Sequence, residues 1–188
     1  MSYDFHLVQR STGDDPLAEA RSLLEQDNED INPGPPSTEK EERKAKLAKL
    51  LIESNPNLTP FEFGFADIAS KYGWTEEEAR VRFRHIELNG PEDSNGIQIT
   101  LYDDKADITV PYWHQPEAAA NVFEEIWRYL AILVENGGFA VYDPQLDRIL
   151  NLSKDRDDVL QKYGGVVSRM PSIIETSEHQ KQPWWKFW

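Results

Sequence analysis

The sequence predicts an α+β protein with an antiparallel sheet and a small all-helical insertion. Alternating apolar residues on both sides of a short acidic turn predict a hairpin at residues 97–112. Apolar residues at helical spacing from Pro116 onward, ending at Gly137 and Gly138, predict the principal core helix. The 188 residues are 39% hydrophobic and include 6 Trp, 7 Tyr and 8 Phe, which is enough material for one sizeable core.

The N-terminal part predicts one strand, one helix and a linker. The strand is expected where apolar and polar side chains alternate, at Tyr3, Phe5 and Leu7. Asp15 before Pro16 is a typical cap and first-turn pair, and the helix should run to about Gln26. Proline and glycine at residues 32–37 disfavour helix and strand, which predicts a linker.

Residues 38–92 are expected to form the helical insertion. Thr38 and Glu41 have the spacing of a capping box, and this helix should end near Ser54. Its predicted apolar stripe, with Lys and Arg opposite, consists of Ala45, Ala48, Leu51 and Ile52. Residues 65–88 predict two short helices separated by Gly73, and Thr75 with Glu78 should cap the second helix.

The chain then returns to the main domain, which is expected to comprise residues 1–30 and 93–170. After the hairpin and the core helix, the sequence predicts a strand from Phe139, a turn at residues 143–147, a further strand at residues 149–152 and a helix at about Asp155 to Tyr163. Outside the insertion the order is strand, helix, strand, strand, helix, strand. This order predicts the split βαβ pattern of a ferredoxin-like sheet. Residues 171–188 form a C-terminal aromatic tail.

Residues 65–85 resemble the helix-turn-helix family. Ala69 takes the small position at the helix crossing, Gly73 the turn, and Ala79 the inward position on the second helix. The resemblance implies a helix presented to the DNA major groove, with Arg80 and Arg84 as phosphate contacts.

The charge pattern favours a different partner. The second helix would begin with three glutamates at residues 76–78, which repel phosphate but suit the positive end of a helix dipole. The whole chain has 20 Lys and Arg against 34 Asp and Glu, a formal net charge of −14. We therefore expect a cationic protein partner or self-association, with nucleic acid disfavoured. There is no Cys, which excludes disulfides and thiolate chemistry, and neither a leader nor a membrane span is expected. The expected location is the cytoplasm.

No catalytic, metal-binding or cofactor-binding residues are predicted. The carboxylates of Asp103, Asp104 and Asp107 could attract a hard cation, but turn formation explains them, and their spacing is not that of a calcium loop. The four histidines lack metal-ligand spacing. His114 could act as a general base if the fold placed it beside Asp143 in a cleft.

An aromatic segment supplies the predicted partner-binding residues. These are Trp184, Trp185, Phe187 and Trp188, together with Trp113. Trp buries a large area at low entropic cost and is favoured in interface hot spots, although the segment could instead fold back over its own sheet. The first hypothesis is a non-enzymatic acidic protein-binding module, such as an immunity or inhibitor-type protein for a basic partner. The alternatives are a helix-turn-helix regulator that uses Arg80 and Arg84, and a hydrolase dependent on His114.

Overall fold

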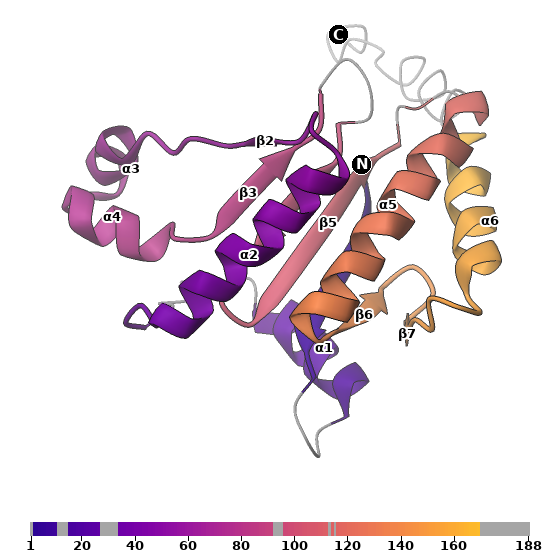
Figure 1. The fold of residues 1–188 in the computed structure, drawn as a ribbon, viewed down its shortest axis with the longest axis horizontal. Helices are drawn as coiled ribbons and strands as arrows, with labels where there is room; N and C mark the ends of the chain where they lie inside the picture. Colours follow the sequence, from indigo (N-terminus) through magenta and orange to yellow (C-terminus); the bar gives the residue numbers. More distant parts are fainter. Residues whose placement is uncertain are drawn as a thin grey trace, which may run out of the picture.

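A computed structural model shows one antiparallel sheet of seven strands with six helices among the residues it describes (Figure 1). These residues are 2–10, 15–26, 34–91, 96–112, 114 and 116–169. The strands are β1 (Ser2–Gln9), β2 (Thr59–Pro60), β3 (Ile86–Asn89), β4 (Gln98–Leu101), β5 (Lys105–Pro111), β6 (Phe139–Asp143) and β7 (Arg148–Ile149). The helices are α1 (Pro16–Gln26), α2 (Thr38–Ser54), α3 (Phe65–Tyr72), α4 (Glu76–Arg82), α5 (Pro116–Gly137) and α6 (Arg156–Val167).

The sheet has the strand order β2-β3-β4-β5-β1-β6-β7. The predicted hairpin is confirmed as β4 and β5, which pair with Ile99 opposite Ile108 and Leu101 opposite Ala106. The first strand is also confirmed and lies between β5 and β6, where Phe5 faces Ile108. Because side chains alternate along a strand, this register directs one apolar row of each central strand to the same face.

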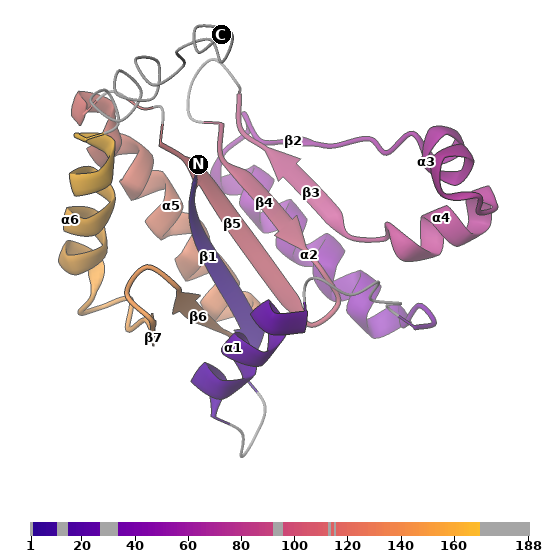
Figure 2. The ribbon, with the colours of Figure 1, turned by 180° about the vertical axis from the view of Figure 1, so that it is seen from behind.

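Helices α2 and α5 cover that apolar face, and α6 packs beside α5 (Figure 1). Phe123, Tyr129 and Leu133 of α5 are fully or almost fully buried there. Helix α1 packs on the opposite face, against Val8 and Ala140, and Figure 2 shows it at the lower end of β1. None of the described helices has both the length and the apolar character that crossing a bilayer requires.

The mixed helix and strand class is confirmed, whereas the ferredoxin-like arrangement is not. The predicted bounds of α1, and the helix stop at Gly138, agree with the structure, in which Gly138 has a φ of 70°. The sheet, however, has three strands beyond a four-stranded core, and α1 and α5 lie on opposite faces. Of these three strands, β7 is the strand predicted after the turn at residues 143–147 and pairs with its neighbour β6, whereas β2 and β3 were not predicted.

Helix α2 has the predicted bounds, a different cap and part of the predicted stripe. Ser37 rather than Thr38 occupies the cap position, without a side-chain hydrogen bond, and the Glu41 carboxylate accepts a hydrogen bond from Lys44 at 2.8 Å. Of the predicted stripe, Ala48 and Leu51 are buried and Ile52 packs against the core, whereas Ala45 is exposed and Lys44 and Leu47 are buried in addition. The helix is therefore rotated relative to the prediction, and a lysine faces inward.

Buried Lys44 belongs to an ion network that joins three segments. Its ammonium donates to Asp103 Oδ1 at 2.9 Å and to the carbonyl oxygen of Arg84 at 2.9 Å. The Arg84 guanidinium pairs with the other oxygen of Asp103 and donates to the carbonyl of Gly34 at 2.7 Å. The network thus ties α2 to the segment before β3 and to the turn between β4 and β5.

Two strands were missed by the sequence prediction. Residues 83–88 were assigned to the end of a helix, but α4 ends at Arg82 and β3 follows from Ile86. This assignment was wrong because the strand is defined by pairing with β4, where Leu88 faces Ile99. Strand β2 closes this side of the sheet, and the N–H of Phe61 donates to the Glu87 carbonyl at 2.8 Å. That bond turns the backbone nitrogen of Pro60 away from β3.

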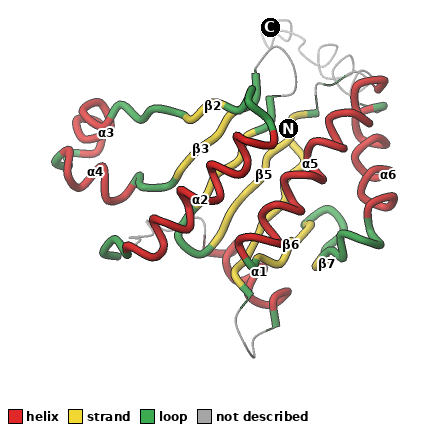
Figure 3. The backbone as a smooth tube through the Cα atoms, in the orientation of Figure 1, coloured by secondary structure: helices red, strands yellow, loops and turns green. Residues whose placement is uncertain are grey.

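Residues 38–92 contribute both to the core and to a projecting unit. Leu47 and Leu51 of α2 and Leu88 of β3 belong to the same apolar core as β1 and α5. Helices α3 and α4 instead stand away from the sheet, connected to β2 and β3 by loops (Figure 3). The aromatic tail at 171–188 and Trp113 lie outside the described residues.

Candidate binding surface

The projecting helices α3 and α4 form a tight hairpin with well-defined ends. Gly73 ends α3 with a φ of 70°, a conformation that favours glycine. The predicted capping box is confirmed at the start of α4, where the Glu78 N–H donates to Thr75 Oγ1 and the Thr75 N–H donates to the Glu78 carboxylate. Hydrogen bonds donated by the Thr75 N–H and by the Thr75 hydroxyl to the Glu78 carboxylate lower the pKa of Glu78. Ala69 and Ala79 are both buried, which allows the two helices to approach closely.

An aromatic cluster lies along this hairpin and the segments on either side of it. Its members are Phe61, Phe63, Phe65, Tyr72, Trp74, Phe83 and His85. Phe63 is central, with its ring centre 5.0 Å from that of Phe61, 5.9 Å from Phe83 and 4.8 Å from His85. Tyr72 and Trp74 are stacked at 4.6 Å. The hairpin therefore brings rings that precede α3 beside rings that follow α4.

Part of the aromatic cluster is exposed. Phe61 is 50% and Tyr72 49% exposed, and they are the two large apolar side chains with high exposure in the described part of the chain. Exposed apolar side chains are unremarkable when single, but Phe61 and Tyr72 are joined by ring contacts through Phe63 and Phe83, which indicates an interaction surface. This is the strongest binding feature among the described residues.

Three cationic side chains of the protein lie over rings of the cluster. The Arg80 guanidinium is 4.4 Å from the ring centre of Phe65. Arg82 lies at 4.4 Å over Trp74, and the Lys71 ammonium lies at 5.4 Å from Tyr72. All three distances fall within the range of cation–π attraction.

A cavity of about 550 Å³ opens beside the cluster. Its aromatic lining is Phe61, Phe63, Phe65, Phe83 and His85. Burial lowers the pKa of His85, so its imidazole is neutral at neutral pH. The cavity therefore has an apolar, aromatic wall that opens to solvent.

The charged side chains that line this cavity differ in whether another residue pairs with them. Arg84 is paired with Asp103, and Arg80 with Glu76 at 3.7 Å. Glu87 accepts a hydrogen bond from the neutral side chain of Asn89 at 2.8 Å. Glu62 is exposed, and no other described residue forms a hydrogen bond or ion pair with it. The charges at the cavity that no opposite charge pairs with are therefore those of carboxylates.

The arginines expected to contact nucleic acid occupy different environments. The Arg80 side chain is 60% exposed, whereas only 9% of the Arg84 side chain is exposed. The guanidinium of Arg84 points into the ion network with Asp103. The helical hairpin implied by the resemblance is present, with Ala69 and Ala79 buried as expected, but only Arg80 is on its surface.

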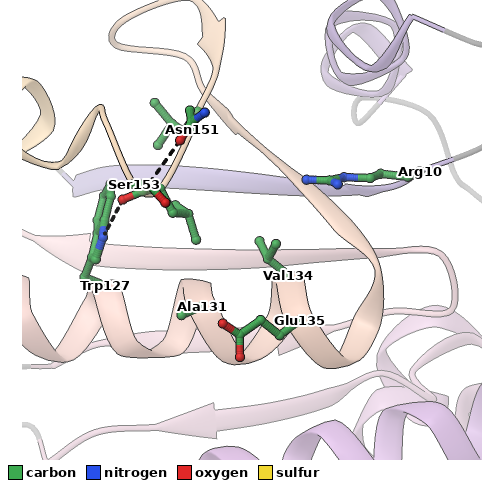
Figure 4. Close-up of a pocket in the computed structure, with 9 residues that line it drawn as sticks. Arg10, Trp127, Ala131, Val134, Glu135, Asn151 and Ser153 are labelled. Atoms are coloured by element: carbon green, nitrogen blue, oxygen red, sulfur yellow. Dashed lines mark hydrogen bonds between the residues drawn. The ribbon is translucent and has the colours of Figure 1, made fainter.

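A second cavity of about 480 Å³ lies between α5 and the loop that follows β7 (Figure 4). Its apolar floor is formed by Trp127, Ala131 and Val134 of α5. The Trp127 indole donates to the Leu152 carbonyl at 3.2 Å, so its hydrogen-bonding group is already used by the loop. Arg10 and Glu135 lie at the rim as its charged groups.

His114 and Asp143 belong to a buried cluster of tyrosines rather than to a cleft. His114 Nδ1 lies 2.6 Å from the Tyr163 hydroxyl, and Asp143 accepts a hydrogen bond from the Tyr3 hydroxyl at 2.7 Å. The rings of Tyr3 and Tyr163 contact edge to face at 5.8 Å. Asp143 is fully buried, and burial raises the pKa of its carboxyl.

The carboxylates at the hairpin turn all have partners within the protein. Asp103 pairs with Lys44 and Arg84, Asp104 pairs with Lys40 and Arg43, and Asp107 lies 2.7 Å from His6 Nδ1. Within the described ranges, no group of three or more potential ligand side chains is arranged to hold a metal ion. These acids contribute to ion pairing within the fold.

Sequence reasoning missed the aromatic cluster as a site. The available signal was the run of phenylalanines at alternate positions, Phe61, Phe63 and Phe65, directly before the predicted helical pair. No family model, curated protein or solved structure matches this chain significantly. Function is therefore inferred from the site alone.

Proposed function

We propose that the chain is a non-enzymatic, acidic protein-binding module and that the aromatic cluster is its binding surface. The observation that carries this proposal is the exposure of Phe61, which directly follows β2, and of Tyr72, the last residue of the projecting helix α3, within one cluster of rings. Aromatic side chains are enriched in interface hot spots because they bury much area at low entropic cost.

The partner in this proposal is a basic protein. A net charge of −14 speeds the encounter with a positively charged surface and weakens association as salt rises. An immunity or inhibitor-type role for a basic effector has these properties, and a cytoplasmic location, consistent with the lack of cysteine, is part of the proposal. The aromatic residues 184–188 and Trp113 remain predicted contributors to partner binding.

The helix-turn-helix alternative rests on the α3–α4 hairpin. Three glutamates at the start of α4, all exposed, oppose DNA binding, and so does the engagement of Arg84 with Asp103. The hydrolase alternative depends on His114, which is only 6% exposed. The central strand order β4-β5-β1-β6 supports a ferredoxin-like core as a proposal about the fold, with α1 on the second face as an addition.

The test is a pull-down from an extract of the source cells, with and without nuclease, followed by mass spectrometry. Four baits are compared. They are the full chain, the double variant Phe61→Ser/Tyr72→Ser, the control Lys162→Ser at an exposed position of α6, and a chain truncated after Gln182. We expect a nuclease-resistant basic protein that the control retains, the double variant loses, and elution at higher salt releases.

Two results would contradict the proposal. Retention that disappears after nuclease treatment would favour the helix-turn-helix alternative. A protein retained equally by the double variant would show that the aromatic cluster is not the binding surface, and loss on truncation alone would assign binding to the tail. Circular dichroism should show the same melting temperature for the full chain, the double variant and Lys162→Ser, since the substituted side chains are exposed.

A further inference from the structure

We infer that the cavity beside Phe61 and Phe63 binds a cationic side chain, lysine or arginine, presented by the partner. This inference rests on the proposed function and specifies the chemistry that the binding surface recognises. It follows from three features of the cavity: the faces of its rings, the balance of its charges, and its size.

The rings of the cluster already attract cations within the protein itself. Arg80, Arg82 and Lys71 each lie over a ring of the cluster at 4.4, 4.4 and 5.4 Å. The negative face of an aromatic ring attracts a cation, and the attraction is stronger where water is excluded. No described cation lies over Phe61, and this side chain is 50% exposed, so a cation from solvent can reach its ring.

The charge balance at the cavity also favours a cation. Arg84 is neutralised by Asp103, and Arg80 is stacked on Phe65 and paired with Glu76. Glu62 lies in the cavity lining without a partner among the described residues, and Glu87 is bonded there to a neutral amide. An incoming ammonium or guanidinium group would therefore meet a carboxylate at Glu62 and the exposed ring of Phe61.

The size of the cavity suits a side chain and its neighbours rather than a whole domain. A volume of about 550 Å³ is within the range of small-ligand pockets. A long aliphatic stem, as in lysine or arginine, would pack against the rings while its charged end reaches Glu62. A neutral side chain of the same length would gain the packing but not the electrostatic attraction.

The experiment is an NMR titration of the full chain with Nα-acetyl-lysine N-methylamide and with its neutral counterpart, Nα-acetyl-norleucine N-methylamide. Amide and aromatic resonances of residues 61–65 and 83–87 report on binding. We expect shifts at these positions and binding of the lysine compound that is about threefold tighter or more than that of the norleucine compound.

Two variants separate the contribution of the Glu62 carboxylate from that of the Phe61 ring, and a third variant is the control. Glu62→Gln removes the carboxylate and should weaken lysine binding by about two- to fivefold. Phe61→Leu keeps an apolar side chain but removes the ring, so it should weaken lysine binding more than norleucine binding. Glu77→Gln, an exposed change on the same helical hairpin but outside the cavity lining, should leave both unchanged.

Equal affinity for the two compounds would overturn the inference, as would unchanged lysine binding in both Glu62→Gln and Phe61→Leu. Either of these outcomes can be distinguished from failure of the proposed function. If the cavity shows no preference for lysine but partner capture still depends on Phe61 and Tyr72, only the inferred chemistry fails. If lysine binds as expected but capture is independent of these residues, the inference stands and the proposed binding surface does not.

Discussion

The ammonium of Lys44 lies 2.9 Å from a carboxylate oxygen of Asp103, and only 1% of the Lys44 side chain is exposed. Asp103 also pairs with Arg84, of which 9% is exposed. Glu41 contacts the same two cations but is 40% exposed, so Asp103, at 15%, is the better buried of the two carboxylates that compensate them. Burying a charge is costly unless it is paired, so stability should depend more on Asp103 than on either of its partners.

We predict that Asp103→Asn destabilises the fold more than Lys44→Met. The first change leaves Lys44 and Arg84 facing each other with only Glu41 nearby, and it should lower the free energy of unfolding by about 3 kcal/mol. Lys44→Met replaces a buried charge with an apolar side chain while Asp103 keeps Arg84, so its cost should be about 1 kcal/mol. Urea unfolding at pH 7 measures the free energy of unfolding of both variants.

Lys49→Met is the control for this pair, because Lys49 is 75% exposed and its contact with Glu53 is long, at 3.8 Å. It should change stability by less than about 0.5 kcal/mol. An equal loss for Asp103→Asn and Lys44→Met would show that the carboxylate does not have the central role assigned to it.

Acid should remove the contribution of Asp103. Burial alone would raise the pKa of this carboxyl, but hydrogen bonds from Arg84 and Lys44, together with their charges, lower it to about 2. A folded-state pKa below the ordinary 3.8 means that the stabilisation is present above pH 4 and is lost as the pH falls towards 2. The loss should be about 2 kcal/mol over this window.

The measurement for this second prediction is the free energy of unfolding from pH 6 to pH 2 for the wild type and Asp103→Asn. The difference between the two proteins should shrink as the pH falls. A constant difference across the range would contradict a lowered pKa at Asp103.

At the other end of the sheet, Tyr3→Phe should destabilise the protein and raise the pKa of Asp143 further. The Tyr3 hydroxyl donates to Asp143 Oδ2 at 2.7 Å, and burial already raises the pKa of this carboxyl. Without the hydroxyl, the charged carboxylate loses a buried donor, at a cost of about 1.5–3 kcal/mol at neutral pH.

The titration of Asp143 contributes to stability with the opposite sign to that of Asp103. A raised folded-state pKa favours folding below the ordinary value, and this advantage is lost as the pH rises through the folded pKa. The deficit of the variant should therefore be smaller in mild acid than at pH 7. Carbon-13 NMR of the Asp143 carboxyl measures its pKa, and Tyr72→Phe on the surface should show neither effect.

Gly137→Ala should destabilise the protein even though alanine favours helices. A Cβ at Gly137 would lie 2.6 Å from two ring carbons of Phe139 and 3.3 Å from Leu47 Cδ1. Both side chains are almost fully buried, so they have little space in which to move. Overpacking of this kind costs about 1–3 kcal/mol, more than the gain in helix propensity.

Gly164→Ala in α6 is the matched control. No atom lies within 4 Å of a Cβ at this helical position, so the change should stabilise by about 0.5–1 kcal/mol. Thermal unfolding of the two variants should shift in opposite directions. Stabilisation by both would indicate that the contact between Gly137 and Phe139 relaxes freely.

Local signals in the sequence predicted much of the fold. Alternation at Ile99 and Leu101, and the stops at Gly73 and Gly138, depend on neighbouring residues and were confirmed. The strands β2 and β3 were not predicted, because two and four residues carry little periodicity and their identity depends on pairing with distant partners. Lys44 was placed on the solvent face because two of its acceptors, the Arg84 carbonyl and the Asp103 carboxylate, lie 40 and 59 residues away.

The candidate site could be predicted less well than the fold. The helical hairpin was recognised, but its function was associated with Arg80 and Arg84 rather than with the aromatic rings. Phe63 and His85 meet only after the chain has turned at Gly73, so their proximity is a property of the folded hairpin. A run of phenylalanines at alternate positions is compatible with an ordinary strand until that turn is known.

Pro60 determines how the β2 edge of the sheet can contact another molecule. A strand at the end of a sheet offers unpaired backbone donors to any extended chain, which promotes edge-to-edge aggregation. Here the outward-facing backbone nitrogen of β2 belongs to Pro60, which has no hydrogen to donate. This margin of the sheet therefore opposes extension by an added strand, and a molecule that approaches it must be recognised by side chains such as Phe61.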